Sequence, residues 1–438
     1  MRRALIFLGF AATALAADPV QLSLKRAVEI ATAPEGSAQI QTAAEAVNIA
    51  KARQQQTRAD LLPNVDGSFT VQNETVNLQA LGLRLASPIP GFTLPDFVGP
   101  FTIVDARLNG TQTIFNFSSI RRLQAARVGT TAAKSDLDNS GETVAAQVAR
   151  AYLAALRADA DVEAAQADIT LSEAVLKQSE NQKAAGTGTG IEITRAKVQL
   201  ANDRQRLIAA WNTRRGARLQ LLRIMNMRMD VDLALTDKLE YKATDVATVA
   251  QARALAFKDR PDLRAQQERE QNARLSASAV KLERLPSLAA LGNYGSIGTS
   301  VFNSVPTRSV GIAVSVPIFD GGRREGRRAE ASAKFRTERV KTNDLKEQID
   351  LDVRLALDNL TSATDQVKVA TEGLELAGNE VAQARRRFDA GVAAGLEVTD
   401  AQTRLTRARE NSIAALYAYN LAQLDLAQAT GRVRNWVQ

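Results

Sequence analysis

The residues that could do chemistry are restricted in this chain, which contains neither cysteine nor histidine. A cysteine nucleophile, a serine–histidine pair and metal sites built from thiolates or imidazoles are therefore excluded by composition. Carboxylates, lysine, tyrosine and the backbone are the groups left. We expect no enzyme activity, no bound metal and no cofactor, and the acids are the candidates for a site.

Acids stand at matching positions in two Gly-rich segments. AAGTGTGIEITRAKVQL (184–200) contains Glu192, and DAGVAAGLEVTDAQTRL (389–405) contains Glu397 and Asp400. Glu192 and Glu397 each follow the first glycine of their turn by six residues, and Arg195 stands where the second copy has Asp400. Acids just after a turn can also favour the N-terminus of a helix electrostatically, and this alternative stays open for Glu192 and Glu397.

The glycines of these segments are expected to make tight turns between helices. A phosphate-binding loop is the competing interpretation, but no buried strand precedes the first segment and no Lys-Ser or Lys-Thr pair follows it. Glycine adopts positive φ angles without steric cost, which suits an interhelical turn. The residues are Gly186, Gly188 and Gly190 in the first turn and Gly391 and Gly395 in the second.

Long helices must position these turns. The eleven prolines leave residues 101–260 and 318–438 free of proline, and proline costs about 3 kcal/mol in a helix interior. In the second half, large apolar residues recur every seven positions between 353 and 388, and alanines fill the layer between them from 356 to 384. The first half repeats these layers 205 residues earlier, and an alanine series from 401 to 429 follows the second turn.

This 3-4 repeat predicts two antiparallel helical hairpins with close helix contacts, near 117–225 and 318–430. Leucine in place of Ala370 is then expected to overpack the alanine layer.

Two shorter segments alternate between apolar and polar residues, around 65–74 and 310–316, and predict strands. Their partners are expected near 106–113 and 288–297, which gives strand pairs near 64–114 and 287–317 with a loop at 86–100. Matching tripeptides, Ile114 to Asn116 and Ile318 to Asp320, end the two pairs. Arginines follow in both halves, and packing and solvation are their default explanation: Arg121, Arg122, Arg323, Arg324, Arg327 and Arg328.

We interpret the strand pairs as parts of a barrel wall with one face toward lipid and the other toward water. Four strands cannot close a barrel, and open edges are not tolerated in hydrocarbon, so the chain is expected to oligomerise. Residues 1–16 have the features of a secretory signal peptide, and no later segment has the length of apolar sequence that a membrane-spanning helix needs.

The formal charge of +8 is dispersed along the chain, and stacking aromatics are not interleaved with the basic residues. This pattern is typical of solvated helix faces, so no nucleic-acid partner is expected.

Several segments resemble the TolC-type outer-membrane channels of Gram-negative bacteria, which serve multidrug efflux and type I secretion. They include LSLKRAVEIA (22–31), ADLLPNVDGSF (59–69), RPDLRAQ (260–266), GIAVSVPIFDGGRR (311–324) and the two turns. The resemblance implies a homotrimer with a 12-stranded barrel in outer-membrane lipid and a long periplasmic helical tunnel. It also divides the chain into residues 17–225 as a first repeat, 226–250 as an equatorial segment and 251–438 as a second repeat.

The resemblance further implies a gate at the periplasmic end, where the hairpins converge around acidic side chains. Glu192, Glu397 and Asp400 match the acids of that gate, and Arg195 departs from the pattern, so that it could pair with an acid on a neighbouring helix. The turns would contact a periplasmic adaptor, and an inner-membrane pump would drive transport. Two other functions stay open: an exported coiled-coil scaffold outside any membrane, and an exported hydrolase with paired acids.

Overall fold

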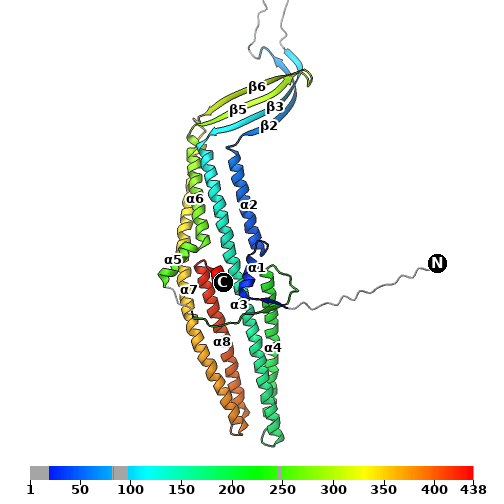
Figure 1. Ribbon diagram of the computed structural model, residues 1–438, viewed down its shortest axis with the longest axis vertical. Coiled ribbons are helices and arrows are strands. Elements are labelled where there is room, and N and C mark those ends of the chain that lie inside the picture. Colours follow the sequence, from blue (N-terminus) through cyan, green and yellow to red (C-terminus); the bar gives the residue numbers. More distant parts are fainter. Residues whose placement is uncertain (1–18, 81, 83–96, 244–247, 438) are drawn as a thin grey trace, which may run out of the picture. The chain divides into compact units, whose positions relative to one another are not determined.

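The structure is a computed structural model that describes residues 19–80, 82, 97–243 and 248–437 (Figure 1). The signal peptide expected at residues 1–16 and residues 86–96 of the expected loop lie outside this range.

Four long helices form the two hairpins that the heptad pattern predicts (Figure 1). Helix α3 (Phe117–Ala184) is followed by α4 (Gly190–Ile224), and α7 (Arg323–Asp389) is followed by α8 (Gly395–Ala429). Within the described residues, no helix is both long enough and apolar enough to cross a bilayer. The prediction of long helices with separate short strands is confirmed.

The heptad positions are largely buried, as their spacing predicts. In α7 the large residues Val353, Leu360 and Phe388 are buried, and so are Ala356 and Ala384 of the alanine layer. The first half and α8 behave in the same way at these buried positions: Val148, Ala155, Ala158, Ile169, Ser172, Ser179, Ala401, Ala415, Ala422 and Ala429.

Ala370 departs from its layer, because it is only partly buried and lines a hollow of about 1140 Å³. Gly373 on the same helix and Ala408 and Ala415 on α8 also line this hollow. These small residues leave space that neither helix fills, so leucine at this position has room. Overpacking is therefore expected to be stronger at fully buried alanines such as Ala384 than at Ala370.

Four strands form one antiparallel sheet in the order β2-β3-β5-β6. They are β2 (Asn64–Asn77), β3 (Phe97–Phe115), β5 (Ser287–Gly298) and β6 (Ser304–Ser315). The central strands β3 and β5 pair from Val104 opposite Gly298 to Thr113 opposite Ala289, so the strand pairs of the two sequence halves join directly. Strand β3 starts at Phe97, which places residues 97–100 in the sheet and not in the expected loop.

The two strand-to-helix junctions differ, although the sequence suggests matching ones. In the first half Phe115 ends β3, and the Asn116 side chain accepts a hydrogen bond from the N–H of Ser119 (3.2 Å) as α3 begins. In the second half β6 ends at Ser315, whose partner Ser287 is the first residue of β5. Ile318 and Phe319 therefore lie in a connection to α7 and not in the strand.

The chain divides into two compact units, and each draws residues from both sequence halves. Of the described residues, unit 1 contains those in 19–44, 136–263 and 345–437, and unit 2 contains those in 45–135 and 264–344. The remaining helices are α1 (Leu24–Thr32), α2 (Ala38–Ala59), α5 (Val249–Asp259), α6 (Pro261–Lys281), the 3₁₀ turn η1 (Leu282–Arg284) and α9 (Val433–Trp436).

Unit 1 holds the segment after α4 against its long helices. Strand β4 (Leu233–Leu235) pairs in parallel with β1 (Val20–Leu22). The Tyr152 hydroxyl of α3 lies 2.8 Å from both the Leu22 carbonyl and the Asp237 carboxylate, and burial raises its pKa. The Tyr419 hydroxyl of α8 donates to the Lys242 carbonyl at 2.5 Å, so residues 233–242 contact both hairpins.

Candidate functional site

The first turn joins α3 to α4 through a short, hydrogen-bonded bend. Gly186 has a φ of +77°, and its N–H donates to the Lys183 carbonyl at 3.0 Å. Gly188 has no positive φ, but a Cβ there would lie 2.9 Å from the Lys183 nitrogen, so only glycine fits. Thr189 then caps α4, which begins at Gly190.

Glu192 occupies the third position of α4, where an acid can cap the helix. Its Oε2 accepts a hydrogen bond from the N–H of Thr189 at 3.0 Å, which is one half of a capping box. The first-turn interpretation left open by the sequence therefore describes Glu192 correctly in this structure.

The second turn has the same bend but a different electrostatic arrangement. Gly391 has a φ of +73°, and its N–H donates to the Phe388 carbonyl at 3.0 Å. Gly395 is the first residue of α8 and has no positive φ. Glu397 does not cap its helix in the way of Glu192, because it forms an ion pair with Arg387 of α7 (Nε to Oε1, 3.0 Å).

The expectation that the three glycines of the first turn supply positive φ angles is therefore wrong for Gly188 and Gly190. Gly186 and Gly391 have this conformation, Gly188 allows a close backbone approach, and Gly190 and Gly395 begin helices.

The two turns of one chain contact each other. The Gln182 side-chain amide at the end of α3 donates to the Phe388 carbonyl of α7 at 3.0 Å. The N–H of Gly395 donates to Glu192 Oε1 at 3.5 Å. A buried cluster of apolar residues from all four helices lies beneath these contacts: Val175, Ala196, Ala377, Val381, Ala384, Phe388, Val398, Ala401 and Leu405. The tips of the two hairpins therefore form one packed end.

The charges at this end partly compensate one another. The N–H of Thr189, assisted by that of Gly395 and by the positive charge of Arg195, holds the pKa of Glu192 below its ordinary value. Asp400 is exposed and lies near Arg404, which pairs with Glu380 at 2.7 Å.

Arg195 is exposed, and within the described part of this chain it forms no ion pair. Its charge acts on Glu192 of its own helix, so the structure does not bring it together with an acid of a neighbouring helix.

Sequence reasoning missed a buried polar cluster farther along the hairpins, formed by Asp168, Ser172, Asp203, Arg206, Thr406 and Arg409. Asp203 of α4 is only 1% exposed and accepts a hydrogen bond from the Ser172 hydroxyl of α3 at 2.5 Å; it also contacts Arg206. Its spacing from the buried residues Ala196, Leu200 and Leu207 places it on the apolar face of α4, and this was the signal available in the sequence.

Asp168 extends the same cluster to the second hairpin. Its carboxylate accepts a hydrogen bond from the Thr406 hydroxyl of α8 at 2.8 Å and pairs with Arg409 Nη1 at 2.5 Å. Arg206 of α4 lies 3.9 Å away. The cluster therefore links α3 and α4 to α8.

The family of outer membrane efflux proteins matches this chain over residues 30–227 and 252–432. The alkaline protease secretion protein AprF of Pseudomonas aeruginosa is 24% identical over 319 residues, which are 70% of this chain and 65% of AprF. The chain thus aligns with less than two thirds of the length of this relative.

Solved structures share the fold at low sequence identity. The Campylobacter jejuni CmeC outer membrane channel is 16% identical, with a TM-score of 0.79, over 93% of this chain and 85% of CmeC. The Vibrio cholerae outer membrane protein VceC is 18% identical, with a TM-score of 0.78, over 93% of this chain and 96% of VceC.

Proposed function

Because the chain belongs to the outer membrane efflux protein family, we propose that it is the passive exit duct of a tripartite efflux or type I secretion system. It is a protein of the outer membrane with a long periplasmic helical extension. An inner-membrane pump supplies the energy, and a periplasmic adaptor engages the hairpin tips. No reaction step belongs to this function.

The sheet supports the membrane part of the proposal. Large apolar side chains are exposed along its outer strands, among them Val65, Phe69 and Val71 of β2 and Val310 and Ile312 of β6. Four strands are too few to close a barrel, and an open edge in hydrocarbon leaves backbone groups without partners. Three copies supply twelve strands, so we propose a homotrimer whose sheets form one wall in lipid.

The packed tips carry the proposed gate, and they are the observation on which its position rests. Both turns lie at one end of the chain's helical hairpins, with Glu192, Glu397 and Asp400 beside them. In a trimer these acids surround one axis, where a ring of carboxylates attracts cations and filters solutes by charge.

The ion pair of Glu397 with Arg387 and the nearby charge of Arg195 weaken that ring. Asp400 is exposed and forms no ion pair within the described residues, so we propose it as the main acid of the ring.

Conductance of the purified protein in planar bilayers tests the gate. The variant E397A/D400A should conduct more than the wild type, and block by divalent cations should weaken. The matched control E372A/E375A removes two exposed acids of α7 away from the turns and should leave both quantities unchanged. Wild-type conductance and block in E397A/D400A would refute the gate assignment.

The alternative of a secreted coiled-coil scaffold predicts a water-soluble protein after export. The duct predicts a protein that fractionates with the outer membrane and needs detergent for extraction. Recovery in the soluble periplasmic fraction would refute the duct.

A further inference from the structure

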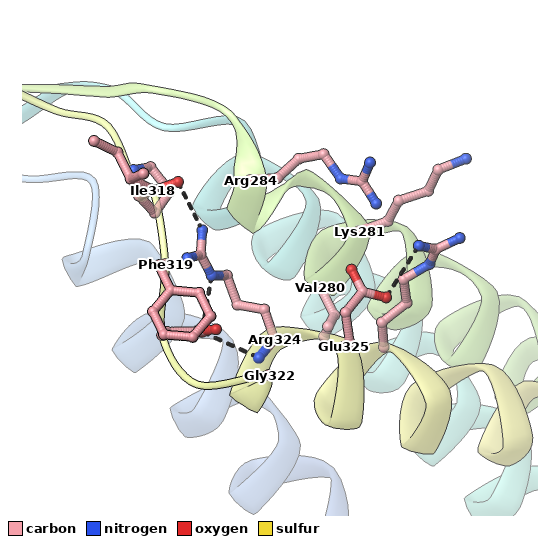
Figure 2. Close-up of a pocket in the computed structure, with 11 residues that line it drawn as sticks. Val280, Lys281, Arg284, Ile318, Phe319, Gly322, Arg324 and Glu325 are labelled. Atoms are coloured by element: carbon pink, nitrogen blue, oxygen red, sulfur yellow. Dashed lines mark hydrogen bonds and ion pairs between the residues drawn. The ribbon is translucent and has the colours of Figure 1, made fainter.

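A pocket of about 370 Å³ lies in unit 2, between the end of α6, the connection from β6 to α7 and the first turns of α7 (Figure 2). Basic side chains outnumber acidic ones in its lining, which includes Lys281, Arg284, Arg324, Arg328, Asp320 and Glu325. We call it the junction pocket.

Both acids of the junction pocket are already matched. Arg324 Nε lies 2.8 Å from Asp320 Oδ2, and Arg324 Nη1 donates to the Pro317 carbonyl at 3.0 Å. Arg328 Nη1 lies 3.3 Å from Glu325 Oε2. These two arginines neutralise the acids and hold the connection against α7.

Lys281 and Arg284 are the two charges left over. Both side chains are exposed, and neither has a hydrogen bond or an ion pair within the described residues. They stand three positions apart on the helical segment that α6 and η1 form, so they share one face. Figure 2 shows both side chains extending without a contact to another drawn residue.

Glu283, the acid between Lys281 and Arg284 in the sequence, does not neutralise the charges of these two residues. Glu283 pairs with Arg327 at 2.8 Å and also contacts Arg122. The junction pocket therefore keeps an excess of two positive charges at its open side, which fits an anionic group.

The opposite wall of the pocket is apolar and exposed. Ile318 and Phe319 line it, and their exposed fractions are 92% and 87%. They follow β6, whose side chains Val310, Ile312 and Val314 are also exposed. Exposed apolar side chains thus continue from the sheet to the pocket, and girdles of aromatic residues flank the apolar band of membrane barrels.

We propose that the junction pocket binds an anionic phospholipid, with Lys281 and Arg284 on the headgroup phosphate and Ile318 and Phe319 against the acyl chains. Basic pockets beside membrane-spanning elements are suited to anionic headgroups. A soluble phosphate ester would use the two cations but would leave both exposed apolar side chains without a role. The inference rests on the proposed insertion of the sheet in a membrane.

Native mass spectrometry of the delipidated full-length protein tests the proposal with three probes: phosphatidylglycerol, phosphatidylcholine with the same acyl chains, and glycerol 3-phosphate. Wild-type protein should bind phosphatidylglycerol more tightly than either other probe. The variant K281Q/R284Q should lose about twenty-five-fold in affinity for phosphatidylglycerol, because each basic side chain contributes about fivefold at an anionic surface.

The control R336Q/R339Q removes two exposed charges from α7 outside the pocket and should bind phosphatidylglycerol like the wild type. The variant I318S/F319S should weaken binding of phosphatidylglycerol but not of glycerol 3-phosphate. Equal affinity of wild type and K281Q/R284Q for phosphatidylglycerol overturns the site, and glycerol 3-phosphate binding as tight as phosphatidylglycerol overturns the lipid assignment.

Bilayer conductance separates this inference from the proposed function. A K281Q/R284Q variant that conducts like the wild type and retains its lipid affinity refutes the junction pocket alone. A wild-type protein that neither inserts nor conducts refutes the duct.

Discussion

Removal of the Asp168 carboxylate should destabilise the contact between the two hairpins. The Asp168 side chain is 9% exposed and accepts from Thr406, which is itself buried, and from Arg409. Breaking a fully buried ion pair by deleting one partner costs about 3 to 5 kcal/mol. Arg409 and Arg206 keep 27% and 40% exposure and can turn toward water, so we expect about 2 to 3 kcal/mol for Asp168→Ala.

Asp168→Asn should cost less, because the amide oxygen still accepts a hydrogen bond from Thr406 while the charge is lost. A neutral partner variant, Arg409→Met, keeps most of the apolar stem of the arginine side chain. The double variant D168A/R409M should then be more stable than the sum of the two single effects predicts, by about 1 to 2 kcal/mol.

Urea-induced loss of helical circular dichroism in detergent measures these differences, since the long helices dominate the signal. Asp365→Ala is the control, because within the described residues Asp365 forms one ion pair, an exposed one with Lys368, and its loss should shift the midpoint by little. If Asp168→Ala is as stable as the wild type, or if the effects in the double variant are strictly additive, the Asp168–Arg409 pair does not stabilise the contact between the hairpins.

Two further predictions concern the tips and the alanine layer. The pKa of Glu192 is lower in the folded than in the unfolded protein, so the stability that Glu192 contributes is complete above about pH 4.5 and is lost as pH falls through the folded pKa. Hydrogen exchange of the tip should therefore become faster in acid in the wild type but not in Glu192→Gln. Identical pH profiles of the two proteins would contradict this prediction. Ala384→Leu should lower the free energy of unfolding by about 1 to 3 kcal/mol, because leucine overpacks a buried contact. Ala370→Leu should lower it less, because the larger side chain enters the hollow. Equal urea midpoints of the two variants would show that the hollow does not accommodate the leucine.

Regular periodicity made much of the helical fold predictable from the sequence. Heptad spacing around Val353 and Leu360 identified the buried face of α7, because a helix presents the same face every seven residues. The sequence predicts that the second strand pair ends near residue 317, and in the structure β6 ends at Ser315. The path of the connection to α7 was not predictable, because it depends on contacts of Arg324 that no local pattern reveals.

The candidate site was predictable in position but not in its interactions. The spacing of Glu192 and Glu397 from their glycines located both acids beside the turns. Their different partners, the Thr189 N–H and Arg387, depend on how each turn folds and on which helix lies next to it. The contact of Gln182 with Phe388 joins residues 206 positions apart, and a single sequence carries no signal for it.

The even number of strands in the sheet has a consequence for assembly. Strands β2 and β6 are its two edges, and the antiparallel order makes them run in opposite directions. A second copy that adds its β2 to the β6 of the first therefore continues the antiparallel alternation, and so does every later copy. Strand polarity permits a ring of any size, so strand pairing alone does not determine the number of subunits. The number of copies must be decided by curvature and by the surfaces of the helices.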